Sequence, residues 1–304
     1  MPVRVRIVEV GPRDGLQNEK VPVSVAVKVE FIRRLAAAKF STIEAGSFVS
    51  PKRVPQMADT AAVLRRLPAD AAVRYPVLVP NLQGMEDALA AGAGEVSVFA
   101  SASETFSYKN IGCSVAESLE RFRPVLELAK AKAIAVRGYV SCALGCPYEG
   151  PVAAAAVAGV SRQLAELGCY EVALGDTIGI GTPHKARDVV RAAAGEIGIR
   201  RIAVHFHDTR GQALANILAC LEQGVTVVDG AVAGLGGCPY APGASGNVAS
   251  EDLVFMLEGM GVDTGVDLDL AIDAGRFICA QLGRGNGSKV AQAMASHGDP
   301  RQAM

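Results

Sequence analysis

The chain has 304 residues, of which 50% are hydrophobic, and its 30 Lys and Arg residues nearly balance its 31 Asp and Glu residues. A chain of this size can bury a large core, and parallel α/β barrels of this length often form one domain. The balanced charge and the aromatic content of 5% exclude the basic, aromatic-rich surface typical of nucleic-acid binding. We therefore expect small molecules and other protein subunits as partners, with a homodimer or higher homo-oligomer as the assembly.

The cysteines and the first residues bear on the cellular compartment. Seven cysteines form no regular framework, which is typical of a reducing compartment rather than of a disulfide-linked secreted protein. The chain enters a predicted strand at once, without the apolar segment of a signal peptide. No apolar run approaches the roughly 18 residues of a membrane span. We expect a cytoplasmic protein that does not cross a membrane.

Short runs rich in Val and Ile alternate with longer Ala-rich segments of helical period, which is the pattern of parallel βαβ units. The first helix is expected at residues 24–38, where Val25, Val29 and Ile32 share one stripe and Lys28 lies largely off it. The eight predicted strands are residues 3–10, 42–45, 74–79, 95–100, 135–141, 171–174, 201–205 and 226–231.

Eight such units within about 260 residues favour a closed (β/α)8 TIM barrel over an open doubly wound sheet. A dinucleotide-binding fold would carry G-x-G-x-x-G after its first strand, but this chain has Gly11-Pro12-Arg13-Asp14-Gly15 there. We predict one domain over residues 1–304. The barrel is expected at about residues 3–262, and an accessory segment at 263–304 with a helix at 269–282.

A segment rich in glycine and proline, residues 234–247, follows the eighth predicted strand. Its composition excludes a helix. Such a segment can be a flexible connector. Because barrel enzymes place their chemistry on the loops at this end, it is also a candidate lid.

Two of the four histidines, His205 and His207, stand one residue apart after the apolar run 202–204. Alternate side chains of a strand face the same way, so both imidazoles are expected to point together. Neutral imidazole is a common ligand of divalent metals. Alone, the pair fits a metal site and a hydrogen-bonded structural pair equally well.

The carboxyl ends of barrel strands meet around one cavity, so residues distant in sequence become neighbours there. Asp14, His205, His207 and Asn247 together offer two nitrogens, a carboxylate and an amide oxygen, a set that suits Mg²⁺ or Mn²⁺ better than structural zinc. Asp14 and Asn247 each adjoin a glycine, and each also fits an ordinary turn residue. Their convergence with the histidines favours metal binding.

Four further residues belong to the same predicted face. Arg13 fits a surface ion pair or, beside a metal, a cation that stabilises a developing enolate. Glu44, at the end of the second predicted strand, and Asp176, after the sixth, are expected to orient Arg13 or the histidines. Cys238 is either a small residue of a mobile loop or a thiol acid or base carried by a lid.

The blocks that contain these residues resemble the 3-hydroxy-3-methylglutaryl-CoA (HMG-CoA) lyases, a family of the metal-dependent barrel superfamily that also holds isopropylmalate and homocitrate synthases. The resemblance covers about residues 7–293. Gly236-Gly237-Cys238-Pro239-Tyr240 is similar to the lyase signature and distinguishes lyase from synthase. The other blocks are residues 8–19, 47–52, 137–142 and 174–179 and the histidine segment.

The resemblance implies that Asp14, His205, His207 and Asn247 bind the divalent ion, Mg²⁺ or Mn²⁺. The ion would chelate the C3 hydroxyl and an acyl or carboxylate oxygen of an acyl-CoA substrate, which acidifies the hydroxyl. The general base would be Asp14 or a metal-associated water.

The resemblance further implies cleavage of the C2–C3 bond, with Arg13 stabilising the acetyl-CoA enolate and Cys238 taking part in its protonation. The products would be acetyl-CoA and acetoacetate, as in leucine catabolism and ketone-body chemistry. Gln17 and Thr177 are assigned to substrate binding on the same basis.

Several positions depart from the family pattern. Ala231 and Ala173 stand where serines are usual, and the second change bears on the acyl pocket. Residues 283–285 replace a more basic stretch, so CoA contacts are not carried over there. Two alternatives remain open: a lyase for a longer 3-hydroxyglutaryl-CoA, such as an isohexenyl form, and a non-catalytic metal-binding barrel. Arg13 and Cys238 argue against the second, because metal binding alone needs neither.

Overall fold

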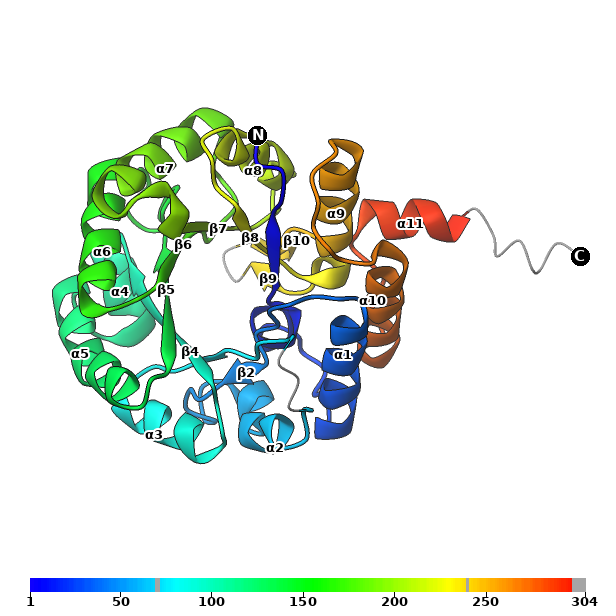
Figure 1. The fold of residues 1–304 in the computed structure, drawn as a ribbon, viewed down its shortest axis with the longest axis horizontal. Helices are drawn as coiled ribbons and strands as arrows, with labels where there is room; N and C mark the ends of the chain where they lie inside the picture. The colour runs from blue at the N-terminus through cyan, green and yellow to red at the C-terminus, as the bar shows by residue number, and fades with distance from the viewer. Residues whose placement is uncertain (69–71, 239–240, 297–304) are drawn as a thin grey trace, which may run out of the picture.

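The computed structural model describes residues 1–68, 72–238 and 241–296, and the side chains of 238, 241–245 and 296 lie outside the description. Within these ranges, helices form a ring around an eight-stranded parallel sheet with the order β1-β8-β7-β6-β5-β4-β3-β2 (Figure 1). The strands are β1 (Arg6–Glu9), β2 (Gly46–Ser47), β3 (Val77–Leu78), β4 (Glu95–Ser101), β5 (Ala135–Ser141), β6 (Glu171–Asp176), β7 (Ile202–Phe206) and β8 (Val227–Gly230).

The sheet closes on itself through the chain just before β2. Glu9 at the end of β1 pairs in parallel with Ile43, and its amide donates to the carbonyl of Thr42 at 3.0 Å. The amide of Glu44 donates in turn to the carbonyl of Glu9 at 2.9 Å. The predicted TIM barrel is therefore confirmed.

The second and third strands are shorter than predicted. The segment 42–45 forms bridges that close the barrel, and β2 itself is Gly46–Ser47, so Glu44 precedes this strand instead of ending it. β3 is limited to Val77–Leu78. Pro76 and Pro80, which have no amide hydrogen to donate to a neighbouring strand, flank it.

The helices cover the outside of the barrel. They are α1 (Val25–Ala37), α2 (Thr60–Leu64), α3 (Leu82–Ala90), α4 (Glu104–Ile111), α5 (Val115–Ala131), α6 (Ala154–Leu167), α7 (Pro183–Ile197), α8 (Ala213–Leu221), α9 (Ser250–Gly259), α10 (Leu268–Leu282) and α11 (Lys289–Ser296), with single turns η1 (Gly11–Gly15), η2 (Pro55–Met57), η3 (Ile199–Arg201) and η4 (Val232–Gly234). The Ser24 hydroxyl caps α1 by accepting from the amide of Val27. The predicted accessory helix at 269–282 is confirmed as α10.

One expectation for α1 is wrong. Lys28, predicted to lie off the apolar stripe, is buried, and its ammonium group donates to a carboxylate oxygen of Asp59 at 2.6 Å. A buried ammonium group is tolerated when such a partner compensates its charge. The helix thus turns Lys28 toward η2 and α2, where the carbonyl of Gln56 also accepts from it.

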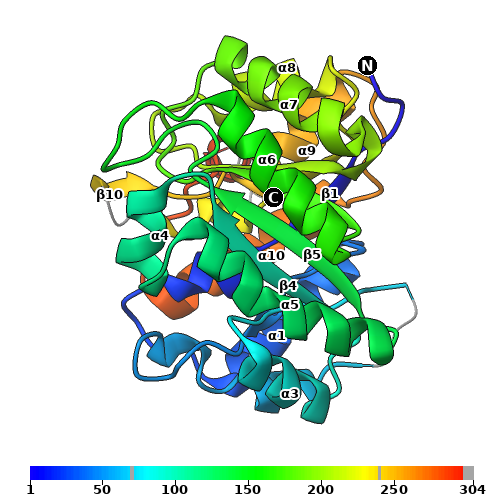
Figure 2. The same cartoon turned by 90° about the vertical axis from the view of Figure 1, so that its left-hand side faces the viewer.

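The segment 234–247 is not a plain loop. After η4, β9 (Gly237–Cys238) and β10 (Ala241–Ser245) pair antiparallel, with Ala241 opposite Cys238. Figure 2 places β10 and α4 together at one end of the barrel, opposite the N-terminus. The hairpin therefore stands at the end where loops follow the strands.

The C-terminal helices pack on the barrel's outer ring. α10 lies against α1, and α11 lies against α9 (Figure 1). Buried apolar residues from Val5 to Leu282 belong to one hydrophobic cluster. This continuity supports the prediction of one domain, whose boundaries stay predictions.

Truncating the buried side chain of Leu35 in α1 is expected to lower the free energy of unfolding by about 2–5 kcal/mol, because it leaves a cavity in the core. The matched change Leu270→Ala removes a side chain that is 40% exposed and should cost less than about 1 kcal/mol. Urea titrations of both variants measure the difference. Equal destabilisation would contradict this placement of α1.

Candidate active site

The turn η1, directly after β1, positions Arg13 and Asp14. The amide of Gly15 donates to the carbonyl of Val10, five residues back, at 3.1 Å, which gives a wide π-helical turn. A Cβ atom on Gly15 would lie 2.7 Å from the Cβ of Leu235, so only glycine lets η1 approach the base of the hairpin this closely. The sequence GPRDG thus brings both side chains to the carboxyl end of the barrel.

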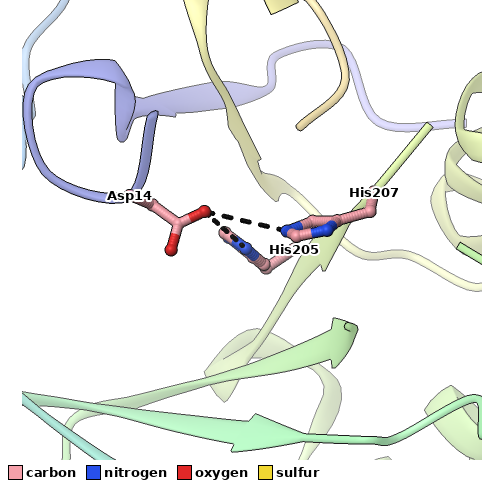
Figure 3. A group of neighbouring side chains, drawn as sticks. All are labelled: Asp14, His205 and His207. Carbon is pink, nitrogen blue, oxygen red and sulfur yellow. Dashed lines mark ion pairs between the residues drawn. The ribbon is translucent and has the colours of Figure 1, made fainter. Parts of the chain in front are cut away.

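Asp14, His205 and His207 converge (Figure 3). Asp14 Oδ2 lies 3.8 Å from Nε2 of His205 and 3.7 Å from Nε2 of His207, and one ligand atom from each residue falls within 4.8 Å of the others. His205 is the last residue but one of β7, while His207 lies just beyond the strand and forms an isolated bridge with Asn247. Both histidines are buried. Two imidazoles and a carboxylate in this arrangement fit a divalent metal.

The charges around this cluster also favour a cation. Arg13 donates through Nε to Glu44 Oε2 and through Nη1 to Asp14 Oδ1, each at 2.6 Å. One guanidinium group thus faces two carboxylates, which leaves an excess of negative charge beside the histidines. Ser97 donates its hydroxyl to the other oxygen of Glu44 at 3.0 Å, which fixes that carboxylate. Glu44 therefore contacts Arg13, one of the partners expected for it from the sequence.

The carboxyl group of Asp14 is held in its ionised form. Burial would raise its pKa, but the guanidinium of Arg13 and the two histidines outweigh burial and lower the pKa well below the usual value. The same carboxylates hold the pKa of Arg13 above its usual value despite burial. Asp14 therefore presents a negatively charged oxygen to this cluster at neutral pH.

Asn247 also reaches the cluster, but its amide nitrogen is the atom that faces Asp14. Nδ2 donates to Asp14 Oδ2 at 2.8 Å and to the carbonyl of Leu235 at 3.2 Å. A half-turn of the amide exchanges its nitrogen and oxygen. Asn247 is thus close enough to serve as a ligand through Oδ1 after such a rotation.

The remaining predicted site residues whose side chains are described lie outside the cluster of Asp14, His205 and His207. Asp176 is fully buried, and its carboxylate accepts from the amides of Ile180 and Gly181, so it shapes the turn after β6. The hydroxyl of Thr177 accepts from the amide of Cys142 at 2.8 Å. The Cys238 side chain lies outside the described residues. A cavity of about 490 Å³ is lined by Arg13, Asp14, Gln17, Thr177, His205 and His207, among others.

Comparison with known proteins places this chain in a family. The HMGL-like family model matches residues 4–278. The chain belongs to the HMGL-like family. Membership confirms the family resemblance predicted from the sequence blocks.

Relatives within the HMGL-like family resemble the chain over almost its whole length. The mitochondrial hydroxymethylglutaryl-CoA lyase of Gallus gallus is 59% identical, covering 96% of this chain and 98% of the relative. The 3-hydroxy-3-isohexenylglutaryl-CoA/hydroxy-methylglutaryl-CoA lyase of Pseudomonas aeruginosa is 56% identical, covering 97% and 98%. The crystal structure of hydroxymethylglutaryl-CoA lyase from Pseudomonas aeruginosa superposes with a TM-score of 0.97 at 56% identity, covering 98% of this chain and 99% of that chain.

Among the residues that the structure describes, no helix is both long and apolar enough to cross a membrane.

Two residues near the histidines were missed by the sequence reasoning. Asp229 on β8 accepts from His205 Nδ1 at 3.1 Å, and the ring of Tyr139 on β5 lies edge-on to the His205 ring, with the ring centroids 5.7 Å apart. Each is a polar residue within a buried strand, and that signal could have found them.

A second group of buried carboxylates holds the base of the hairpin. Glu9 accepts from the amides of Gly11 and Val232 at 2.9 and 3.1 Å and from the Ser250 hydroxyl at 2.6 Å. Glu251 accepts from the amide of Ala233 at 2.8 Å. Burial raises the pKa of Glu9 to about 7 and that of Glu251 to about 8.

The raised pKa of Glu9 predicts a pH dependence of stability. The folded state holds this proton between the usual pKa of 4.5 and about 7, so the contribution is complete below pH 4.5 and is lost as pH rises through 7. The variant Glu9→Gln lacks this titrating carboxyl group. Its free energy of unfolding should therefore fall between pH 5 and pH 8 by on the order of 2–3 kcal/mol less than that of the wild type. Urea titrations of the metal-free proteins at both pH values measure this, and parallel pH profiles would contradict it.

Proposed function

We propose that this protein is a divalent-metal-dependent lyase that cleaves HMG-CoA to acetyl-CoA and acetoacetate, a reaction of leucine catabolism. One observation carries the proposal. Asp14, His205 and His207 face the same cavity as the fixed cation of Arg13, in a chain 56–59% identical to proteins named as HMG-CoA lyases. A cavity of about 490 Å³ beside the cluster favours a catalytic role over metal binding alone.

The ion would be held by Asp14, His205 and His207, with the amide oxygen of Asn247 as a fourth ligand. Bound there, Mg²⁺ or Mn²⁺ supplies a Lewis acid that acidifies the 3-hydroxyl of the substrate. Oxygen and imidazole ligands suit either ion. The excess of carboxylate over guanidinium charge at Arg13, Asp14 and Glu44 supports the choice of a cation.

Asp14 is assigned to metal binding and not to proton transfer. A general base works best when its pKa lies near the working pH. The pKa of Asp14 is well below its usual value, because Arg13 and the histidines stabilise the carboxylate. Of the two bases considered from the sequence, this disfavours Asp14.

Arg13 stabilises the negative charge of the acetyl-CoA enolate. Two carboxylates, Asp14 and Glu44, fix its guanidinium group, and the Tyr139 ring lies 5.4 Å from its central carbon. A cation held in place before the reaction stabilises the developing charge without reorganising. Gln17 and Thr177 line the same cavity, which supports their assignment to substrate binding. Cys238 at the hairpin helps to protonate the carbanion.

The compartment and the assembly belong to the same proposal. The six cysteines whose side chains are described are all buried and free of disulfides, which supports a reducing compartment such as the cytoplasm. A homodimer or higher homo-oligomer is expected. The Asp176 carboxylate accepts from the amide of Gly181 and so stabilises the turn that begins with Thr177, which supports the substrate-binding role assigned to Thr177.

The purified protein with Mg²⁺ is expected to release acetoacetate from HMG-CoA and to lose this activity in EDTA. The reason is that the 3-hydroxyl needs the Lewis acid to lose its proton at neutral pH. Enzymatic measurement of acetoacetate, with activity restored by Mg²⁺ or Mn²⁺, tests this. Absence of product from a metal-loaded protein would reject the lyase assignment.

Two variants separate metal binding from proton transfer. Cys238→Ser should lower kcat by about 100-fold or more with metal affinity nearly intact, because it removes only an acid or base. His207→Ala should weaken Mn²⁺ binding by more than about tenfold, because it removes a ligand. Isothermal titration with Mn²⁺ and steady-state rates measure both. Equal metal loss in the two variants would contradict the division of roles.

A second candidate is a lyase that also accepts a longer 3-alkyl chain, which is favoured by the name of the Pseudomonas aeruginosa relative, a 3-hydroxy-3-isohexenylglutaryl-CoA/hydroxy-methylglutaryl-CoA lyase. The cavity has an apolar wall that includes Leu78, Phe99 and Phe122. We expect kcat/KM for HMG-CoA to exceed that for the isohexenyl analogue by at least about tenfold, because added methylenes must fit a pocket built for a methyl group. Side-by-side rates test this, and comparable values would favour the second candidate.

A further inference from the structure

Arg137 on β5 is an arginine buried inside the barrel, with no exposed surface. Its guanidinium group donates to both oxygens of Asp229, through Nη2 at 2.7 Å and Nη1 at 2.9 Å. It also donates to Glu171 Oε1 at 2.7 Å and to the Tyr139 hydroxyl at 2.8 Å. One side chain thus links three strands, β5, β6 and β8.

The first link leads to the metal cluster. Both terminal nitrogens of Arg137 donate to Asp229, and Oδ2 of Asp229 lies 3.1 Å from Nδ1 of His205. A carboxylate on one ring nitrogen fixes the rotation of an imidazole and directs its other nitrogen toward the metal. The other nitrogen of His205, Nε2, does face Asp14. The orientation of His205 therefore depends on Asp229, and that of Asp229 on Arg137.

The second link leads to the substrate side. Tyr139 stands two residues after Arg137 on β5, so both side chains point into the barrel. The Tyr139 hydroxyl accepts from Arg137, its ring meets His205 edge-on, and Arg13 lies over its face. Tyr139 lines the cavity. A displacement of Arg137 would thus reach both His205 and Arg13.

We propose that Arg137 is a positioning residue of the lyase, which orients His205 for metal binding through Asp229 and supports Arg13 through Tyr139. The inference rests on the proposed metal-dependent function. Arg137 acts through these two neighbours and does not touch the substrate. Its bidentate geometry matters, because a planar fork holds both oxygens of Asp229 while a lysine offers a single point charge.

The competing explanation is that Arg137 only neutralises buried carboxylates. Removing such an arginine leaves uncompensated charge and is strongly destabilising, so loss of activity alone would not distinguish the two. Arg74 offers a matched control. It donates to Glu95 at 3.0 Å and to Thr42 at 2.9 Å, at the amino-terminal end of the barrel and away from the cavity.

The test compares Arg137→Lys with Arg74→Lys in the full chain, using Mn²⁺ alone as the probe. Arg137→Lys keeps the charge and loses the fork, and we expect Mn²⁺ affinity to fall by about tenfold or more, the usual effect of losing a residue that supports a metal ligand. Arg74→Lys should bind Mn²⁺ within twofold of the wild type. Isothermal titration gives the affinities, and urea titration gives the stability of each variant.

The outcomes are distinct. Wild-type Mn²⁺ affinity in folded Arg137→Lys, or an equal loss in Arg74→Lys, would overturn the positioning role. Where Arg137→Lys does not fold, the double variant Arg137→Gln with Asp229→Asn removes both charges together, and the same loss of affinity is expected; unchanged affinity there overturns the proposal. Wild-type protein that binds Mn²⁺ but does not cleave HMG-CoA would refute the proposed function only. Wild-type protein that binds no Mn²⁺ would refute both.

Discussion

The site depends on one physical constraint: the carboxylate of Asp14 must stay ionised in a nearly buried place. Burial alone would favour the protonated acid, which is a poor metal ligand. Arg13 and the two histidines reverse this preference, and Glu44 keeps Arg13 in position. The π-helical turn η1 brings Asp14 and Arg13 to this place from neighbouring positions in the sequence.

Charged side chains also occupy the barrel interior beneath the site, where barrels usually pack branched apolar side chains. Arg137 pairs with Asp229 and Glu171, and the pKa of Asp229 falls to about 2 because this guanidinium and His205 outweigh the effect of burial. Desolvating so many charged groups is costly, and replacing a buried ion pair by apolar residues is often neutral or stabilising. The barrel therefore retains a polar interior that stability alone does not require.

The barrel and the cluster of Asp14, His205 and His207 could be predicted because both follow from local pattern. Alternation within a strand aligned the histidines, and parallel topology brought Asp14 to the same end. The roles of Arg137 and Asp229 could not be predicted this way. They are 92 positions apart, and their contact depends on the pairing of whole strands. The hairpin was missed because glycine and proline concealed its short antiparallel pairing.

The turn η1 lies in close contact with the base of the hairpin through Gly15 and Leu235, and the Asn247 amide donates to both Asp14 and the Leu235 carbonyl. These contacts couple η1 to Leu235 and Asn247, which flank the hairpin. A displacement of either residue would reach Asp14, and thermodynamic linkage makes such coupling reciprocal. A ligand that binds one position of the hairpin better than another would therefore change the affinity of the site for its ion, and the ion would change the affinity for that ligand by the same factor.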